Sequence, residues 1–209
     1  MGYLPLTQEF EGTGGLYIKR QQDFGYRMWR NPFNKWPTYF REYRNLLYCS
    51  KHGLPAVQPV AFAMRDHDGH RQAILITCAL DKYFPLSERE TVDKLGFSTR
   101  IKLVKEVANV VRQYHDAGMQ HGCLYPKHIF INRDVVTDDA VRVRLIDLEK
   151  AEPISWWNGG IFRDIDSLNR RSYGWDAKDR LRFLARYLSL IHISEPTRRA
   201  CRSRMPSSA

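Results

Sequence analysis

Lys19 and Glu42 are charged residues whose surroundings could bring them together around phosphate groups. Lys19 lies in the alternating run Leu16–Arg20, where it shares one face of a predicted strand with Tyr17. Glu42 lies 23 residues further on, inside a segment with helical character. A strand lysine held by a helix glutamate is a known arrangement for binding the α- and β-phosphates of a nucleotide. A lone strand lysine is more often a solvated surface residue. The interpretation of Lys19 and Glu42 as a nucleotide-binding pair therefore depends on further motifs in the chain.

A second set of reactive side chains follows a long amphipathic segment. The run from His121 to Ile131 reads HGCLYPKHIFI and ends in apolar, strand-like residues. The catalytic loop of protein kinases, H-R-D-L-x-x-x-N, lies in the same way between a helix and a strand. His121 and Leu124 agree with that pattern, whereas Cys123 stands at the aspartate position and His128 at the asparagine position.

A third feature is the carboxylate of Asp147, at the end of an apolar run that starts at Val143. The aspartate of the kinase D-F-G motif, which binds the Mg²⁺ that bridges the nucleotide phosphates, follows a strand in this way. A single strand-end aspartate is commonly a turn residue. The strand lysine, the helix glutamate, the loop that starts at His121 and the strand-end aspartate occur in the order and spacing of a kinase. Together these four elements favour a kinase fold.

Five runs of the chain resemble the InaA/WaaP-type lipopolysaccharide kinase family of Gram-negative bacteria: YIKRQ, WPTYFREYRNL, HGCLYPKHIFIN, LIDLEKA and DRLRFLARYL. The similarity extends over about residues 14–187. It implies an α+β, two-lobed protein-kinase-like fold with a small sheet-rich N-lobe and a helical C-lobe. It also implies ATP-dependent phosphorylation, with Mg²⁺, of a sugar hydroxyl in the lipopolysaccharide inner core, on the cytoplasmic side.

The resemblance assigns roles around the nucleotide. Lys19 would contact the ATP phosphates with Glu42 as its helix partner, and Asp147 would bind the metal. His128, at the asparagine position, would be a second metal ligand through its neutral imidazole, although Mg²⁺ prefers oxygen ligands. The segment from Cys78 to Asp81 would be the hinge against which adenine packs.

The resemblance also assigns roles around the reacting hydroxyl. His121 and Cys123 would belong to the catalytic loop, and Asp164 would be the buried aspartate that braces this loop. A thiol at position 123 is a poor replacement for a carboxylate that accepts the hydroxyl proton. Phosphoryl transfer depends more on positioning and charge neutralisation than on a base. Two interpretations therefore remain open: an active sugar kinase with an unusual loop, and a pseudokinase that binds or regulates in a stress response without phosphoryl transfer.

The predicted elements divide the chain near residue 80. Residues 1–80 should form the N-lobe, with a strand at 16–20, a helix at 39–51 and a strand pair at 57–65 and 72–79 joined by a turn at Asp66–Gly69. Residues 81–187 should form the C-lobe, with helices at 99–117, capped by Ser98, and at 176–187. Short strands are expected at 128–132 and 141–148.

Both ends of the chain depart from a complete kinase lobe pattern. Gly12, Gly14 and Gly15 lie too close to Lys19 to form a glycine-rich phosphate loop, and indicate a turn before its strand. The expectation is that the natural chain starts upstream of Met1 and is truncated here. Residues 188–209 contain LSLIHISEPTR and SRMPSSA, which resemble translated sequencing adapter, and are expected to be a non-native disordered tail.

Charge and hydropathy limit the classes of partner. The formal net charge is +10, and it falls to +7 without the four arginines and one glutamate of the tail. This modest excess does not indicate a nucleic-acid partner. No apolar run reaches the roughly 18–20 residues of a membrane-spanning helix. The expected location is the cytoplasm, with peripheral contact to the inner membrane, where basic residues such as Arg41 and Arg44 would face anionic lipid or phosphorylated sugar.

Overall fold

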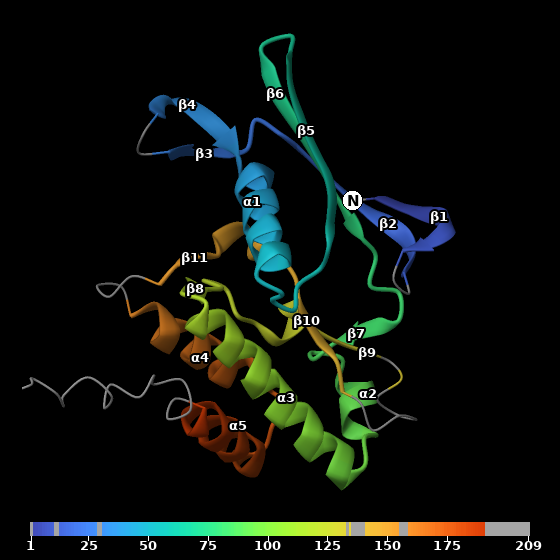
Figure 1. The fold of residues 1–209 in the computed structure, drawn as a ribbon, viewed down its shortest axis with the longest axis vertical. Coiled ribbons are helices and arrows are strands. Elements are labelled where there is room, and N and C mark those ends of the chain that lie inside the picture. The colour runs from blue at the N-terminus through green and yellow to red at the C-terminus, as the bar shows by residue number, and fades with distance from the viewer. Residues whose placement is uncertain are drawn as a thin grey trace, which may run out of the picture.

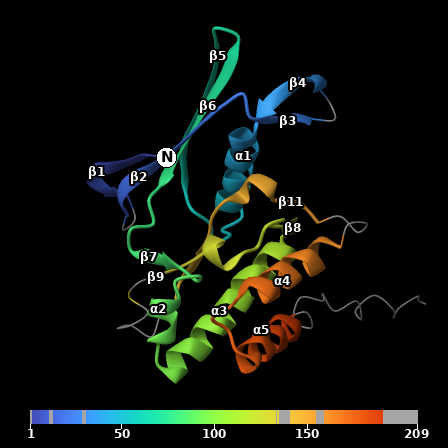
Figure 2. The ribbon, with the colours of Figure 1, turned by 180° about the vertical axis from the view of Figure 1, so that it is seen from behind.

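The computed structural model of the chain divides into a sheet-rich half and a helical half (Figure 1). It describes residues 2–10, 13–28, 31–132, 134, 141–154 and 159–190. In Figure 1 the antiparallel sheet and α1 occupy the upper half, and α3, α4 and α5 occupy the lower half; Figure 2 shows the same division from behind. This arrangement is the predicted two-lobed α+β fold.

A four-stranded antiparallel sheet forms the upper half. Its order is β1-β2-β6-β5, with β1 at Gly2–Phe10, β2 at Thr13–Gln22, β5 at Pro59–His67 and β6 at His70–Cys78. Lys19 lies on β2 opposite Leu75 of β6, so the lysine is on an inner strand of the sheet. A second hairpin, β3 at Gly25–Met28 and β4 at Asn31–Pro37, leads into α1.

Helix α1, at Thr38–Lys51, packs one face against the sheet. Pro37 precedes its first residue, and the C-cap is His52, followed by Gly53 with φ 65°. The buried positions share one face, spaced three or four residues apart, as a helix on a core requires: Thr38, Glu42, Leu46 and Cys49. Three of these side chains are small or apolar, and the fourth, Glu42, must find a partner for its buried charge.

The lower half is organised around α3, at Phe97–Asp116. Its predicted apolar positions are confirmed as core, since all are at most 1% exposed: Leu103, Val104, Val107, Val110, Val111 and Tyr114. Around it are β7 at Tyr83–Pro85, α2 at Arg89–Asp93, β8 at Met119–Gln120, the 3₁₀ turn η1 at Pro126–His128 and β9 at Ile129–Asn132. The chain continues through β10 at Val143–Leu145, the 3₁₀ turn η3 at Leu148–Lys150, β11 at Glu152–Pro153, α4 at Gly160–Arg171 and α5 at Ala177–Ser189.

Several predicted element boundaries were correct and others were wrong. The strand pair and its turn are confirmed as the β5–β6 hairpin, with Asp68 and Gly69 at positive φ. The predicted Ser98 cap is wrong: Gly96 occupies the N-cap of α3 and no side chain caps it. Helix α4 was not predicted. Strand β2 includes Gly14 and Gly15, so the predicted turn is shorter, and its residues 11 and 12 lie outside the described part of the chain.

The predicted tail lies mostly outside the described residues, which end at 190. Helix α5 continues to Ser189, two residues past the predicted boundary at 187. Within the described ranges, no helix combines the length and the apolar character that crossing a bilayer requires.

Asp179 joins α5 to α3 through buried charge. Its side chain is 0% exposed, and its Oδ2 lies 2.7 Å from Nη2 of Arg100 on α3. Its Oδ1 lies 3.0 Å from Nη1 of Arg182. The backbone N–H of Asp179 donates to Oδ1 of Asp176, the N-cap of α5, at 2.7 Å. The carboxylate therefore connects two helices and lies in the first turn of one of them.

Replacing this carboxylate should destabilise the lower half strongly. Asp179→Ala removes the buried partner of the Arg100 guanidinium, which among the described residues keeps only the Gly174 carbonyl and the half-exposed Asp93 carboxylate at 3.7 Å, so we expect the free energy of unfolding to fall by about 3 kcal/mol. Urea unfolding followed by circular dichroism measures the change. Asp166→Ala is the matched control, because Asp166 pairs with Arg170 at the surface, where both side chains are more than half exposed. That loss should be under about 0.5 kcal/mol; equal losses for the two variants would contradict the assignment.

Candidate active site between the two lobes

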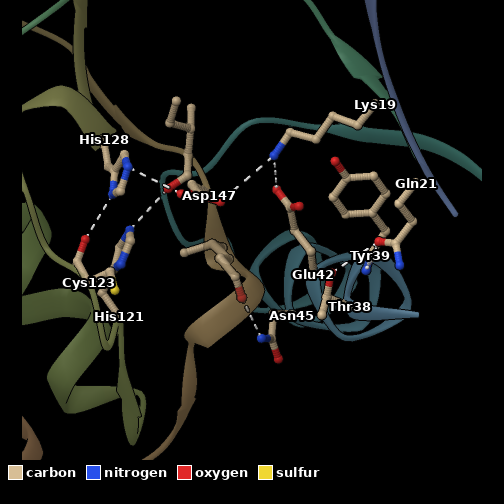
Figure 3. Close-up of polar contacts among 12 residues, drawn as sticks. Lys19, Gln21, Thr38, Tyr39, Glu42, Asn45, His121, Cys123, His128 and Asp147 are labelled. Carbon is tan, nitrogen blue, oxygen red and sulfur yellow. Dashed lines mark hydrogen bonds and ion pairs between the residues drawn. The ribbon is translucent and has the colours of Figure 1, made fainter. Parts of the chain in front are cut away.

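A cavity of about 510 Å³ lies where the sheet meets the helical half. Its walls come from β2, α1, the segment after β6, η1 and the end of β10, and six of the nine predicted site residues line it: Lys19, Glu42, Cys78, Asp81, His128 and Asp147. The other three do not line it: His121 and Cys123 lie in the segment that precedes His128, and Asp164 lies on α4. Figure 3 shows Lys19 and Glu42 on one side of Asp147 and His128 on the other.

Lys19 and Glu42 form an ion pair. Nζ of Lys19 lies 2.7 Å from Oε1 of Glu42, and the two side chains are 13% and 1% exposed. Burial by itself would lower the pKa of Lys19, but the carboxylates of Glu42 and Asp147 outweigh it and raise that pKa. Burial raises the pKa of Glu42, and the ammonium of Lys19 opposes this only in part. The lysine is therefore held as a fixed positive charge that points toward the cavity.

Asp147 stands at the centre of the site. Its backbone has φ 61° and ψ 52°, a left-handed conformation that is unusual for an aspartate and common at functional sites. Oδ1 lies 3.9 Å from Nζ of Lys19, and Oδ2 lies 3.1 Å from Nε2 of His128. The carboxylate thus lies between a side chain from each lobe and keeps 34% of its surface exposed.

Two histidines pack behind Asp147. The rings of His121 and His128 stack with their centroids 5.7 Å apart and their planes at 8°. Nε2 of His121 donates to the carbonyl oxygen of Ile146 at 3.0 Å, and Nδ1 of His128 donates to that of Cys123 at 2.8 Å. Burial lowers the pKa of both imidazoles. The carbonyl of Cys123 therefore orients His128, while the Cys123 thiol lies outside the cavity wall.

Asp164, on α4, holds the loop from below. It is 1% exposed, and its carboxylate accepts hydrogen bonds from the backbone N–H of His121 at 2.6 Å and of Gly122 at 2.9 Å. Gly122 has φ 75°, and a Cβ there would lie 2.5 Å from the carbonyl oxygen of Lys150. This position therefore requires glycine, whose backbone can turn both amides toward one carboxylate. The geometry agrees with the bracing position that the resemblance implied for Asp164.

Further residues of the site were missed in the sequence. Lys127 lines the cavity beside His128, and its position directly before His128 was the available signal. Asn45, on α1, donates from Nδ2 to the carbonyl oxygens of Leu148 and Ala151, both at 2.7 Å. His115 contacts Asp164 at 3.4 Å and the hydroxyl of Tyr187 at 2.7 Å. The contacts of Asn45 and His115 join parts of the chain that are distant in sequence, so no local sequence pattern predicts them.

The side chains around Asp147 fit Mg²⁺ only in part. Mg²⁺ in nucleotide sites is bound by one or two carboxylates and by the phosphates, which suits Asp147. Imidazole nitrogen, offered by His128, is a ligand that Mg²⁺ does not prefer. Among the described residues there is no group of three or more histidines, cysteines, aspartates or glutamates that could hold a metal by itself. A cation here would need ligands from a bound nucleotide or from water.

The interlobe cavity, with a strand lysine, a helix glutamate and a carboxylate after β10, defines a protein-kinase-like protein. The lipopolysaccharide kinase (Kdo/WaaP) family model matches residues 8–187, and the chain belongs to this family. Protein InaA of Escherichia coli (strain K12) is 25% identical over 139 residues, which are 65% of this chain and 62% of InaA. The chain therefore spans less than two thirds of the length of that relative.

A solved structure described as WaaP in complex with acyl carrier protein has a similar fold. It superposes with a TM-score of 0.62 at 21% sequence identity, and the match covers 89% of this chain and 78% of WaaP. The yeast RNA Pol II CTD kinase CTDK-1 complex is more distant, with a TM-score of 0.46 at 15% identity over 74% of this chain and 47% of that one.

The buried histidines should make the stability of the fold depend on pH. His121 has a folded pKa below its ordinary value of 6.5 because of burial. The unfolded chain therefore binds a proton at His121 that the folded chain does not, so stability is lost as the pH falls below about 6.5. Thermal unfolding should show a lower melting temperature at about pH 5.5 than at about pH 7.5.

A variant isolates this contribution. His121→Gln keeps a donor near the Ile146 carbonyl and cannot titrate, so its melting temperature should change less between the two pH values than that of the unchanged chain. His67→Gln, at a histidine whose side chain is 58% exposed, is the control and should leave the dependence intact. If His121→Gln shows the same pH dependence as the unchanged chain, the buried imidazole is not its source.

Proposed function

We propose that the chain is an ATP-dependent phosphotransferase that acts on a sugar hydroxyl of the lipopolysaccharide inner core. The observation that carries the proposal is the approach of Lys19 and Asp147, from different lobes, in one cavity. A fixed ammonium beside a partly exposed carboxylate suits a polyphosphate with its divalent cation. Membership of the lipopolysaccharide kinase family supports the class of acceptor.

Each side chain has a role in this proposal. Lys19, held by Glu42, neutralises the α- and β-phosphates of ATP, and Asp147 holds the divalent cation. That cation, when bound, neutralises charge that develops on the phosphate oxygens. The segment from Cys78 to Asp81, on the cavity wall, packs against adenine.

The transfer itself requires little covalent work from the protein. The sugar hydroxyl oxygen forms a bond to the γ-phosphorus while the bond to the β–γ bridging oxygen breaks, and the hydroxyl proton is released. Asp164 and Gly122 fix the loop on which His128 and Cys123 lie, so the acceptor side of the cavity is rigid. Cys123 supplies no carboxylate to accept the proton. In this proposal the rate enhancement therefore comes from positioning of the reactants and neutralisation of the phosphate charge.

The same proposal places the protein in the cytoplasm with peripheral contact to the inner membrane, where a lipopolysaccharide precursor is accessible. The formal charge of +7 that remains without the tail supports contact with anionic lipid or phosphorylated sugar. Nucleic acid is not part of the proposal.

Nucleotide binding should stabilise the folded chain in a manner that depends on Asp147. ATP with a divalent cation at about 100 times its dissociation constant should add about 2.7 kcal/mol to the free energy of unfolding, which thermal unfolding detects readily. Asp147→Ala should abolish the shift because the cation loses its carboxylate. Asp166→Ala, at a surface carboxylate on α4, should retain it. Absence of any shift in a cooperatively folded sample would overturn the proposal.

A pseudokinase is the second candidate, favoured by Cys123 and His128 in place of the usual carboxylate and amide. Cys123→Asp tests it, because a carboxylate at this position supplies the absent proton acceptor. If the chain is an active kinase limited by this position, phosphate transfer to isolated inner-core oligosaccharide should rise about 10²-fold. Cys123→Ser, similar in size and without a carboxylate, is the control and should give no rise. Nucleotide binding without transfer in the unchanged chain and in Cys123→Asp would support the pseudokinase.

A further inference from the structure

A second, smaller cavity borders the same 3₁₀ turn η1 as the interlobe cavity. Pro126 lines the smaller cavity, and the next two residues, Lys127 and His128, line the interlobe cavity. The smaller cavity measures about 50 Å³, and a single water molecule needs about 10–15 Å³ of such space. It therefore has room for a group of the size of a phosphate or a carboxylate. Its walls include Leu86, Ser87, Arg89, Pro126, Arg171 and Trp175.

Two arginines on this wall have no carboxylate partner in the part of the chain that the structure describes. Arg89 is the first residue of α2, and Arg171 is the last residue of α4. Two acidic side chains near Arg89 in the chain have other partners. Glu88 accepts a hydrogen bond from a side chain of α2, and Asp93 faces Arg100 at 3.7 Å. The two guanidinium groups therefore leave uncompensated positive charge beside the cavity.

The guanidinium of Arg171 is held by an aromatic ring. Its Cζ lies 3.8 Å from the centroid of Tyr125, and such a stack fixes the plane of the guanidinium while its N–H groups can still donate within that plane. The ring of Tyr125 also stacks with that of His128, with their centroids 5.4 Å apart. Tyr125 therefore contacts both a cation of the smaller cavity and an imidazole of the interlobe cavity.

The segment between α4 and α5 forms a fixed wall with a spare donor. Nη2 of Arg100 donates to the carbonyl oxygen of Gly174 at 2.5 Å, and Nη2 of Arg180 donates to that of Ser172 at 3.0 Å. Trp175 is 6% exposed, and its indole N–H has no acceptor among the described residues. A buried indole N–H usually has a hydrogen-bond partner. The wall therefore supplies donors and lacks acceptors, which is the arrangement that an anion requires.

We propose that the smaller cavity is an anion subsite for the acceptor of the kinase. Arg89 and Arg171 bind a phosphate or carboxylate that the acceptor sugar carries in addition to the hydroxyl that receives the phosphoryl group. Guanidinium groups suit this ligand because their N–H groups pair with two oxygens of one anion. The inference rests on the proposed function, which places the reacting hydroxyl in the interlobe cavity. The acceptor is then an acidic sugar and not a neutral one.

The position of the subsite suits an acceptor that reaches both cavities. Only η1 lies between their walls, so a sugar held by its anion in one cavity can present a hydroxyl to the other. The binding energy of the anion then orients the hydroxyl for transfer. ATP does not need the smaller cavity in this arrangement, because Lys19 and Asp147 both line the other one.

Phosphorus magnetic resonance of glucose 6-phosphate with the full chain tests the inference. Dissociation constants are measured with and without saturating ADP and Mg²⁺, and ADP binding is measured separately by calorimetry. Glucuronate and glucose serve as competitors, one with a carboxylate and one without charge. Inorganic phosphate is titrated in parallel. Arg171→Gln removes one guanidinium of the subsite. Arg163→Gln is the matched control, because Arg163 is exposed on the same helix, two turns earlier, and the same charge is lost.

Glucose 6-phosphate should bind equally well with and without ADP. Its dissociation constant should rise about tenfold in Arg171→Gln, the loss expected for one charged hydrogen-bond donor, and stay unchanged in Arg163→Gln. Glucuronate should displace it if the subsite also takes carboxylates, and glucose should not. Inorganic phosphate should bind more weakly than glucose 6-phosphate. Circular dichroism establishes that each variant is folded, and Arg89→Gln, with the same expected loss, replaces Arg171→Gln if the latter is not.

The outcomes separate the subsite from the proposed function. Binding of ADP without binding of glucose 6-phosphate, or displacement of glucose 6-phosphate by ADP, overturns the inference and leaves the proposed function standing. An equal loss in Arg171→Gln and Arg163→Gln shows attraction to general positive charge and also overturns the inference. Inorganic phosphate that binds as tightly as glucose 6-phosphate overturns the assignment to the acceptor. Binding of glucose 6-phosphate that depends on Arg171, in a chain that does not bind ADP, supports the anion site and overturns the proposed function.

Discussion

A charge buried between two lobes must be neutralised from both of them, and this constraint organises the site. The ammonium of Lys19 enters from the sheet, and Glu42 of α1 and Asp147 of the helical half surround it at 2.7 and 3.9 Å. Removing these charges from water is costly, so their geometry must be held by the surrounding structure. The position of α1 on the sheet and the backbone conformation of Asp147 both serve this requirement. Lys19 is therefore held in place without a ligand, and in the proposed function this lowers the ordering cost of binding phosphate.

The helical half fixes its side of the cavity by a different means. Asp164 accepts two backbone N–H groups of one loop, and this buried carboxylate is contacted in turn by His115 of α3. Such a network is stable only when every member is satisfied. If the loop shifted, the buried carboxylate of Asp164 would lose these two hydrogen bonds. Cys123 and His128, which follow these amides in the chain, are thus held close to a fixed anchor point.

The sequence was informative where a signal was local. Lys19, Glu42 and Asp147 could be found because each follows from a strand or helix period and from the order of neighbouring elements. The core face of α3 followed from its 3.6-residue period. Helix α4 was missed although its sequence carried the same kind of signal, because Ile161, Ile165 and Leu168 recur at helical spacing and face the core. Asn45 was missed for another reason: its partners lie more than 100 residues away, where only the tertiary structure brings them close.

The two contacts of α1 have a mechanical consequence. Glu42 and Asn45 lie three residues apart on the same helix, so they project from nearly the same side of it. Glu42 holds the lysine, and Asn45 holds the carbonyl oxygens of Leu148 and Ala151, which follow Asp147 in the chain. A translation of α1 away from the site would therefore strain both contacts. Helix α1 thus couples Lys19 of the sheet to the segment that follows Asp147, so a displacement of this helix would disturb both of them at once.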